Sequence, residues 1–361
     1  MSIASTDFAL SLLKTASSPT GSYVLSPFSM GSALAMVHDG ARGETQKELT
    51  QLLHKGGSAD NVTEHYSKLS SSLTTATDVK TSVANRFFLA QGFKLKDDYK
   101  EHVEKKYKAG VEQVNMKDTA TSANKMNSFV NEKTEGMIPK LIEPPHVSGA
   151  VAVLINAVYF KGKWKMEFNT DNTKDETFHG AKGDRQEPFM YGRKFDVQYN
   201  FSDDFQAVSL PYKDAGYSLL VVMPRDFTEW RQKLTGEKLY EIMNGLSKSK
   251  VNIEMPKFKI ETALDGGETL QKLGVTRIFG SEADLTGISD SDDLQVSKVI
   301  HKAVIDVSEE GTKAAAATAV VMARCMRPMI PEIIPTFRAD RPFLYALVHE
   351  QSNVLFVGQF A

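Results

Sequence analysis

The chain has 361 residues, of which 41% are hydrophobic and 24% charged, and its formal net charge is −2. This composition indicates a soluble globular protein, and the near-neutral charge gives no general argument for binding nucleic acid or an anionic membrane. The single cysteine, Cys325, excludes an internal disulfide, and no apolar run approaches the roughly 20 residues needed to span a bilayer.

The first part of the chain is predicted to be mainly helical. Residues 5–16 place Phe8 and Leu12 on one helix face, behind Ser5, Thr6 or Asp7 as a cap, and they lack the cationic start and apolar core of a signal peptide. We therefore expect a cytoplasmic protein, with an extracellular one as the alternative.

Further elements of this first part follow from apolar periodicity. Residues 28–37 carry apolar or small side chains around the whole helix, which predicts a buried helix. Residues 83–90 predict a strand, and residues 97–108 and 123–135 predict two further helices.

From Val151 onward strands dominate. Residues 151–160, VAVLINAVYF, predict a strand that is buried on both faces. Strand-like segments recur at 206–212, 217–224, 251–260, 299–307, 343–350 and 354–360. Helices early and strands late predict an α+β fold with large mixed or antiparallel sheets. No break in composition divides the chain, so residues 1–361 are predicted to form a single domain.

Sequence patterns of catalysis are absent. The chain has no G-x-G-x-x-G, G-x-x-x-x-G-K-[ST], G-x-S-x-G, H-E-x-x-H or C-x-x-C, and none of its eight histidines pairs with another at metal-ligand spacing. We expect no metal and no cofactor. Cys325 with a distant histidine could form a thiol dyad, but it lies between Arg324 and Arg327 after a run of small residues, not at a strand-to-helix junction. An enzyme is therefore disfavoured.

Residues 309–327, EEGTKAAAATAVVMARCMR, are the most unusual segment. One interpretation is an alanine-rich helix, because alanine has the highest helix propensity. The other is a segment that can insert between strands, because its run of glycine, alanine, threonine and valine leaves no bulky side chain that would resist insertion.

The order of the chain's motifs resembles that of the serpin family. The most specific block is residues 156–164, NAVYFKGKW, followed by Phe168, Thr173 and Phe178-His179. Further similar motifs occur at 25–29, 40–45, 85–88, 126–130, 210–212, 255–258, 283–288, 301–303 and 340–344. The resemblance covers essentially the whole chain and is closest to the intracellular ovalbumin-like or invertebrate type.

This resemblance implies three β-sheets, eight or nine helices and an exposed reactive loop at about residues 309–335. It also implies suicide inhibition of serine proteases: the protease cuts the loop, and the upstream part of the loop inserts into the largest sheet before the acyl bond hydrolyses. The implied partner is a target protease held in a covalent acyl-enzyme complex. We expect a monomer without nucleic acid, membrane or a strong glycosaminoglycan site.

The residues suit loop insertion. If Thr312 begins the inserted strand, the alternation of side chains along a strand places only small or uncharged side chains on the face that Thr312 occupies. Lys313 falls on the opposite face. By resemblance, the hinge comprises Glu310, Gly311, Thr312, Ala314, Ala315, Ala316, Ala317 and Thr318.

The scissile bond follows from the family's spacing of fourteen positions after the hinge glycine, which gives Cys325-Met326. Slips of one position involve Arg324 or Arg327 instead. A small apolar Cys325 would suit elastase-like or chymotrypsin-like enzymes.

Two further sites are implied by the resemblance. A buried polar cluster, the shutter, comprises Ser26, Ser29, Asn156 and His301, and Trp164 marks the breach, where insertion begins. Each of these could instead be an ordinary core residue. The alternatives for function are cross-class inhibition of papain-like cysteine proteases and a non-inhibitory chaperone or carrier.

Overall fold

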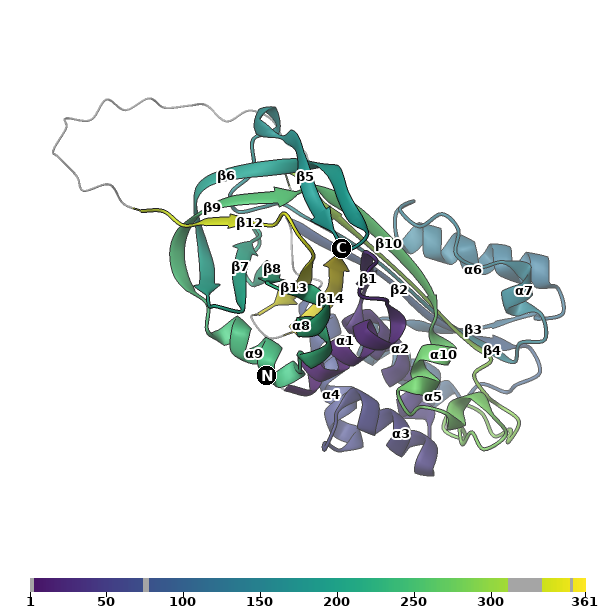
Figure 1. The fold of residues 1–361 in the computed structure, drawn as a ribbon. Coiled ribbons are helices and arrows are strands. Elements are labelled where there is room, and N and C mark those ends of the chain that lie inside the picture. Colours follow the sequence, from purple (N-terminus) through teal and green to yellow (C-terminus); the bar gives the residue numbers. More distant parts are fainter. Residues whose placement is uncertain (1–2, 74–77, 311–332, 351–352) are drawn as a thin grey trace.

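The computed structural model describes residues 3–73, 78–310, 333–350 and 353–361 (Figure 1). These residues confirm the α+β class, with helices concentrated in the first third and strands in the remainder. The described residues contain ten α-helices, one more than the upper expectation, and α7 is a single turn. They are α1 Ile3–Ala16, α2 Pro27–Gly40, α3 Gly43–Leu53, α4 Ala59–Ser72, α5 Asp97–Tyr107, α6 Thr119–Lys133, α7 Pro144–Val147, α8 Phe227–Lys233, α9 Gly236–Asn244 and α10 Gly266–Lys272.

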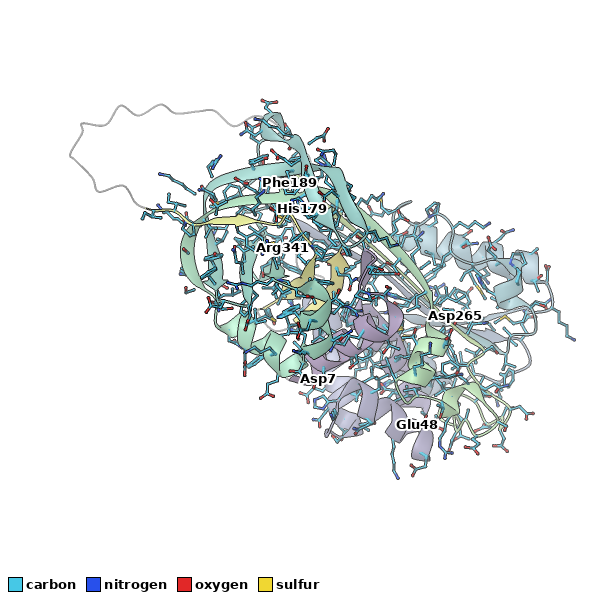
Figure 2. The ribbon with its side chains drawn as sticks, viewed as in Figure 1. Asp7, Glu48, His179, Phe189, Asp265 and Arg341 are labelled. Atoms are coloured by element: carbon cyan, nitrogen blue, oxygen red, sulfur yellow. The ribbon has the colours of Figure 1, made fainter. Side chains whose placement is uncertain are left out.

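Helix α2 is buried along almost its whole length, as its sequence predicts. Pro27 occupies the first turn, where its missing N–H costs nothing, and the Ser26 Oγ caps the helix by accepting a hydrogen bond from the Ser29 N–H at 3.1 Å. The start of α1 differs from prediction, because the helix already includes Ile3. Asp7 therefore lies within α1, where its Oδ1 accepts from the Gly236 N–H of α9 at 2.9 Å (Figure 2).

A five-stranded sheet runs in the order β10-β11-β4-β2-β3. Its strands are β10 Phe258–Asp265, β11 Lys298–Val307, β4 Ala152–Gly162, β2 Val79–Ala90 and β3 Gly110–Val114. Strands β4 and β11 are direct parallel neighbours over eight registered pairs, one of which is His301 with Asn156. As predicted, β4 is buried on both faces.

The remaining strands form one nine-stranded network, which divides into two parts because β6 is long and bent. Strand β6 pairs with β5 over Gly183–Phe189 and with β7 over Gln198–Phe201, and its register with β9 shifts between Gly192 and Phe195. The expected three sheets thus correspond to the five-stranded sheet and the two halves of this network. Its strands are β1 Tyr23–Leu25, β5 Lys174–Gly180, β6 Gly183–Phe201, β7 Phe205–Pro211, β8 Tyr217–Pro224, β9 Ser247–Pro256, β12 Thr336–Arg338, β13 Phe343–His349 and β14 Asn353–Phe360.

One strand prediction was too coarse. The segment at 251–260 is divided at Lys257 between β9 and β10, which belong to different sheets. A proline at the end of β9 removes a backbone donor there, and the chain crosses from one sheet to the other at that point.

Alternation along β4 separates the core into layers. Val153 and Ile155 pack in the cluster that contains α6, whereas Leu154 packs with α1 and α2. Val158 belongs to a third cluster, formed largely by the nine-stranded network. Asn156 lies between Leu154 and Val158 on the same face, so it stands where two apolar clusters meet.

Candidate functional site

A row of three polar side chains crosses the middle of the five-stranded sheet. Asn85 of β2 is the registered partner of Asn156 of β4, and Asn156 is in turn the registered partner of His301 of β11. Asn156 and His301 are fully buried, and Asn85 is 8% exposed. The row therefore joins adjacent strands at one level, including the parallel pair β4 and β11.

The hydrogen bonds fix the protonation of His301. The Ser26 N–H donates to the His301 Nε2 at 3.2 Å, so Nε2 must be the unprotonated nitrogen. Nδ1 then carries the proton and donates it to the Asn156 Oδ1. This bond is the side-chain connection across the seam between β4 and β11.

Asn156 continues the network toward the helix beneath the sheet. Its Nδ2 donates to the Ser29 Oγ and to the Asn85 Oδ1. The Ser29 Oγ donates to the Asn85 Oδ1 at 3.4 Å, and the Ser26 Oγ donates to the Leu355 carbonyl of β14 at 2.6 Å. The start of α2 is thus bound to both sheets through short polar side chains.

Burial has a clear effect on the charge of this network. Desolvation lowers the pKa of His301 from 6.5 to about 3, because a protonated ring would have to be buried without water. The ring is therefore neutral at physiological pH. A neutral ring can accept from Ser26 while donating to Asn156, which a doubly protonated ring could not do.

A second group of contacts lies where β11 ends. The indole Nε1–H of Trp164 donates to the Ser308 carbonyl at 2.7 Å. The Trp164 ring stacks on Tyr212 with centroids 4.3 Å apart, and it lies nearly perpendicular to the Phe168 ring. Trp164 therefore fixes the backbone of the residue that directly follows β11.

Glu309 is the buried charge of this region, with 5% of its surface exposed. Its carboxylate accepts from the Thr173 Oγ1 and pairs with the Lys257 Nζ, each at 2.8 Å, and its carbonyl accepts from the Phe168 N–H at 2.9 Å. Burial alone would raise the pKa of Glu309, but the hydrogen bonds from Lys257, the backbone and Thr173 outweigh it and hold the pKa below its usual value.

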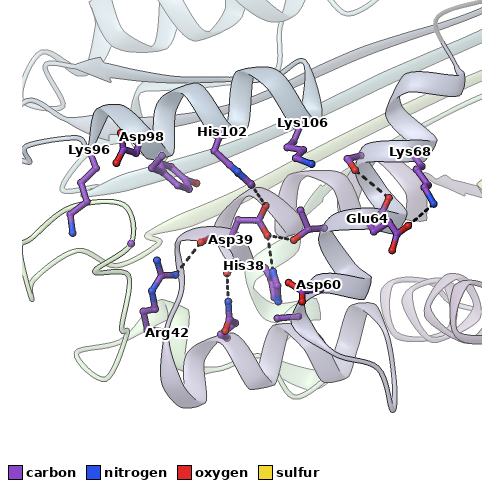
Figure 3. Close-up of a pocket in the computed structure, with 16 residues that line it drawn as sticks. His38, Asp39, Arg42, Asp60, Glu64, Lys68, Lys96, Asp98, His102 and Lys106 are labelled. Atoms are coloured by element: carbon purple, nitrogen blue, oxygen red, sulfur yellow. Dashed lines mark hydrogen bonds and ion pairs between the residues drawn. The ribbon is translucent and has the colours of Figure 1, made fainter.

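A third polar cluster surrounds Asp39 in a cavity of about 950 Å³ (Figure 3). The carboxylate accepts from Thr63 at 2.6 Å, from Tyr107 and His102 at 2.7 Å, and from His38 at 3.0 Å. Burial would raise the pKa of Asp39, yet these hydrogen bonds lower it overall. The cluster ties the end of α2 to α4 and α5.

The comparisons with known proteins decide the family. The family model described as "Serpin (serine protease inhibitor)" matches residues 3–361. The chain belongs to the serpin family. Among its relatives is the leukocyte elastase inhibitor of Sus scrofa, 35% identical over 100% of this chain and 99% of the relative. Serpin B6 of Pongo abelii is 34% identical over 98% of this chain and 97% of the relative.

Solved serpin structures are similar over nearly the whole chain. Serpin48 of the insect Tenebrio molitor has a TM-score of 0.86 and 32% identity, and the match covers 99% of this chain and 96% of that one. The serpin fold and the ovalbumin-like type expected from the sequence are therefore confirmed. Within the described residues, no helix is long and apolar enough to cross a membrane, and no cluster of potential metal ligands occurs.

The structure brings the four predicted shutter residues of this serpin together in one network. It places Trp164 against Ser308, two residues before Glu310, the one hinge residue that is described. The other predicted hinge residues and Arg324, Cys325, Met326 and Arg327 lie outside the described residues.

Sequence reasoning missed Asn85 and Glu309 as members of these sites. Asn85 stood within a matching strand motif and differs from Phe87 and Leu89, which share its face and pack in the core. An asparagine on a strand face that is otherwise apolar indicates a buried polar network. Glu309 carried no such signal, because its partners Thr173 and Lys257 are distant in sequence.

Proposed function

We propose that this serpin is a suicide-substrate inhibitor of serine proteases, in which the cleaved loop inserts between β4 and β11. The carrying observation is the arrangement of these two strands. They are parallel neighbours, and the predicted reactive loop follows directly from β11. A segment that turns back after Glu310 and enters this seam runs antiparallel to both strands, so each side gains a ladder of hydrogen bonds.

The energy balance favours insertion. Opening the seam removes one parallel ladder of eight registered pairs, and an inserted strand forms two ladders in its place. About ten additional hydrogen bonds at about 1 kcal/mol each give a gain on the order of 10 kcal/mol. The intact form is then metastable and persists for kinetic reasons.

Loop composition agrees with this proposal. A strand that begins at Thr312 would put Thr312, Ala314, Ala316, Thr318, Val320 and Met322 on one face. None of these side chains is charged, so burial of that face beneath the sheet carries no charge-desolvation penalty.

The polar row would act as the latch of the seam. Separation of β4 from β11 breaks the hydrogen bond between His301 and Asn156, and an inserted strand would place new side chains between them. Trp164 and Glu309 would hold the start of the loop until cleavage. The described contacts support these roles for the shutter and breach residues.

We propose Cys325-Met326 as the reactive bond, and a protease of elastase-like or chymotrypsin-like specificity as the target. A relative that is named for inhibition of leukocyte elastase supports this choice. The protease serine would attack the Cys325 carbonyl, form an ester and release Met326 as a new amino terminus. We further propose one domain over residues 1–361, a monomeric cytoplasmic protein, no cofactor and no catalytic activity of its own.

Intact mass measurement after brief exposure to pancreatic elastase or chymotrypsin tests the proposal. We expect a covalent complex on denaturing gels and a released peptide that begins at Met326. Cleavage without a covalent complex would refute inhibition. A complex with a papain-like protease alone would establish the cross-class alternative.

A further inference from the structure

Two histidines flank the Asp39 carboxylate in the cavity between α2, α3, α4 and α5 (Figure 3). The Asp39 side chain is 6% exposed. Its Oδ1 accepts from His38 and Thr63, and its Oδ2 accepts from His102 and Tyr107. These bonds occupy the lone-pair positions of both oxygens, so the carboxylate needs no further donor. The property of the cluster that can still change is the charge of its histidines.

His102 can take up a proton without losing its bond to Asp39. A carboxylate only accepts, so the His102 Nε2, at 2.7 Å from Asp39, carries a hydrogen and Nδ1 carries a lone pair. The His102 side chain is 39% exposed, so water can deliver a second proton. Burial would raise the pKa of Asp39, but its hydrogen bonds hold that pKa below the ordinary value, so Asp39 keeps its negative charge in mild acid. Protonation of His102 therefore converts a neutral donor into the cation of an ion pair.

His38 differs from His102 in the elements that it joins. It donates through Nδ1 to Asp39 and bonds through Nε2 to the Thr50 Oγ1, each at 3.0 Å. Its partners thus lie on α2 and α3, whereas His102 joins α5 to α2.

Other charged and titratable groups face the cluster from each helix around it. Burial and the Asp39 charge raise the pKa of Tyr99 and of Tyr107, so both phenols stay neutral. The cavity wall carries the cations Arg42, Lys68, Lys96 and Lys106 and the carboxylates Asp60, Glu64 and Asp98. Carboxylates, lysines and arginines titrate mainly outside the range from pH 5.5 to 7.5, so histidine protonation dominates in that range.

The bond between His102 and Asp39 joins two parts of the fold that loop insertion would separate. One part is anchored to the nine-stranded network: α2 follows β1 after one residue, and β10, the neighbour of β11, follows β9 after one residue. The Val24 N–H of β1 also donates to the Thr262 Oγ1 of β10 at 3.0 Å. The other part consists of β4 with β2 and β3, together with α5, which connects β2 to β3. Asp39 belongs to the first part and His102 to the second.

A strand that enters between β4 and β11 moves them apart by about 4.8 Å, the spacing of neighbouring strands. Hydrogen bonds are lost over a much shorter distance. Helix α5 cannot keep its present contacts with the end of α2 while β4 moves. The bonds from His102 and Tyr107 to Asp39 must therefore break or re-form during insertion.

We propose that His102 and Asp39 act as a proton-dependent restraint on loop insertion. Protonation of His102 strengthens its bond to Asp39, because hydrogen bonds between ionised partners are roughly twice as strong as neutral ones. The seam then opens more slowly in mild acid than it would with an uncharged side chain at position 102. The inference rests on the proposed insertion between β4 and β11 and adds a means of regulating it.

Peptide annealing tests the restraint without a protease, whose own activity would vary with pH. A synthetic peptide with the sequence of residues 312–323 is added to the uncleaved protein, and its incorporation at pH 5.5 and pH 7.5 is followed by the rise in unfolding temperature. His102→Gln keeps an N–H donor for Asp39 but cannot be protonated. We expect the ratio of its annealing rate to that of the wild type to be about three- to tenfold higher at pH 5.5 than at pH 7.5. His301 and the peptide are the same in both measurements, so their pH dependence cancels.

Two further variants complete the test. His102→Arg carries a permanent charge, so at pH 7.5 it should anneal the peptide about three- to tenfold more slowly than the wild type. His179→Gln is the matched control: His179 also pairs with an aspartate, Asp184 at 2.9 Å, but both belong to the hairpin of β5 and β6, so its rate ratio should not depend on pH. A ratio for His102→Gln that is the same at both pH values would overturn the restraint and leave insertion standing. A peptide that raises the unfolding temperature of none of these proteins at either pH would refute the proposed insertion, and the restraint with it.

Discussion

The buried His301 makes a quantitative prediction for stability as a function of pH. Its pKa is lowered to about 3 in the folded protein, whereas an unfolded histidine titrates near its ordinary value of 6.5. Below pH 6.5 His301 therefore binds a proton in the unfolded chain but not in the folded protein. The stability that the neutral ring contributes is complete above pH 6.5 and declines as the pH falls toward 3.

The magnitude follows from the size of this shift. At pH 5 the unfolded histidine is nearly fully protonated and the folded one is still neutral. At about 1.36 kcal/mol for each pH unit, His301 alone should lower the free energy of unfolding by about 2 kcal/mol between pH 8 and pH 5. Any folded pKa of 4 or lower gives nearly the same figure.

The assay is urea unfolding of the uncleaved protein at a series of pH values, with the first transition as the readout. His301→Gln can still accept from Ser26 and donate to Asn156, but it cannot take up a proton. We expect its stability to fall by about 2 kcal/mol less than that of the wild type between pH 8 and pH 5. Carboxylates such as Asp39 and Glu309 contribute equally to both proteins, so they cancel in the difference.

An exposed histidine provides the control. His179 has 57% of its side chain exposed, and His179→Gln tests whether loss of any histidine changes the slope. Identical pH slopes for the wild type and His301→Gln would refute the reasoning, because His301 would then bind a proton as readily in the folded protein as in the unfolded chain.

Three further predictions concern the seam and the loop. Asn156→Ala leaves the His301 Nδ1–H without an acceptor and should lower the free energy of the first urea transition by about 2–4 kcal/mol. The control Asn131→Ala, on the exposed face of α6, should change that free energy by less than about 0.5 kcal/mol. Equal effects of the two substitutions would mean that the buried network is not formed. Glu309→Gln removes the charge that pairs with Lys257 and should lower the unfolding temperature at low salt more than in 1 M NaCl, and a salt-independent loss would contradict the pairing. Thr312→Arg should convert the inhibitor into a substrate by placing a charge on the inserting face, so denaturing gels should show cleaved protein in place of covalent complex; a wild-type yield of complex would exclude the proposed insertion.

Elements with strong periodicity were predictable from the sequence. The apolar run of β4 and the all-round apolar surface of α2 specify burial without reference to distant residues. The division of residues 251–260 between two sheets was not predictable in this way. Local pattern reports whether a segment is extended, but the sheet that it joins depends on partners far along the chain.

The candidate site shows the same limit at the level of single side chains. The four residues predicted to form the shutter were located through the family's motifs, yet their geometry depends on register. Asn85, Asn156 and His301 meet because three separately predicted strands align at these positions. Glu309 illustrates the converse. The sequence around Glu309 predicts an exposed carboxylate. Only the fold brings Thr173 and Lys257 close enough to stabilise that carboxylate in a buried position.

The location of the polar row explains why a buried network can coexist with a sheet that must open. An apolar pair at positions 156 and 301 would hold β4 and β11 together through buried contact area. As the strands separated, an inserted apolar side chain would progressively replace that contact area and restore nearly the same energy. Hydrogen bonds lose most of their strength over a short separation. The bond between His301 and Asn156 therefore opposes the first small movement of β4 away from β11, and opposes further movement little. Such a contact raises the barrier to opening, whereas its loss subtracts only about 2–4 kcal/mol from the gain on the order of 10 kcal/mol that insertion provides, a combination that suits a metastable inhibitor.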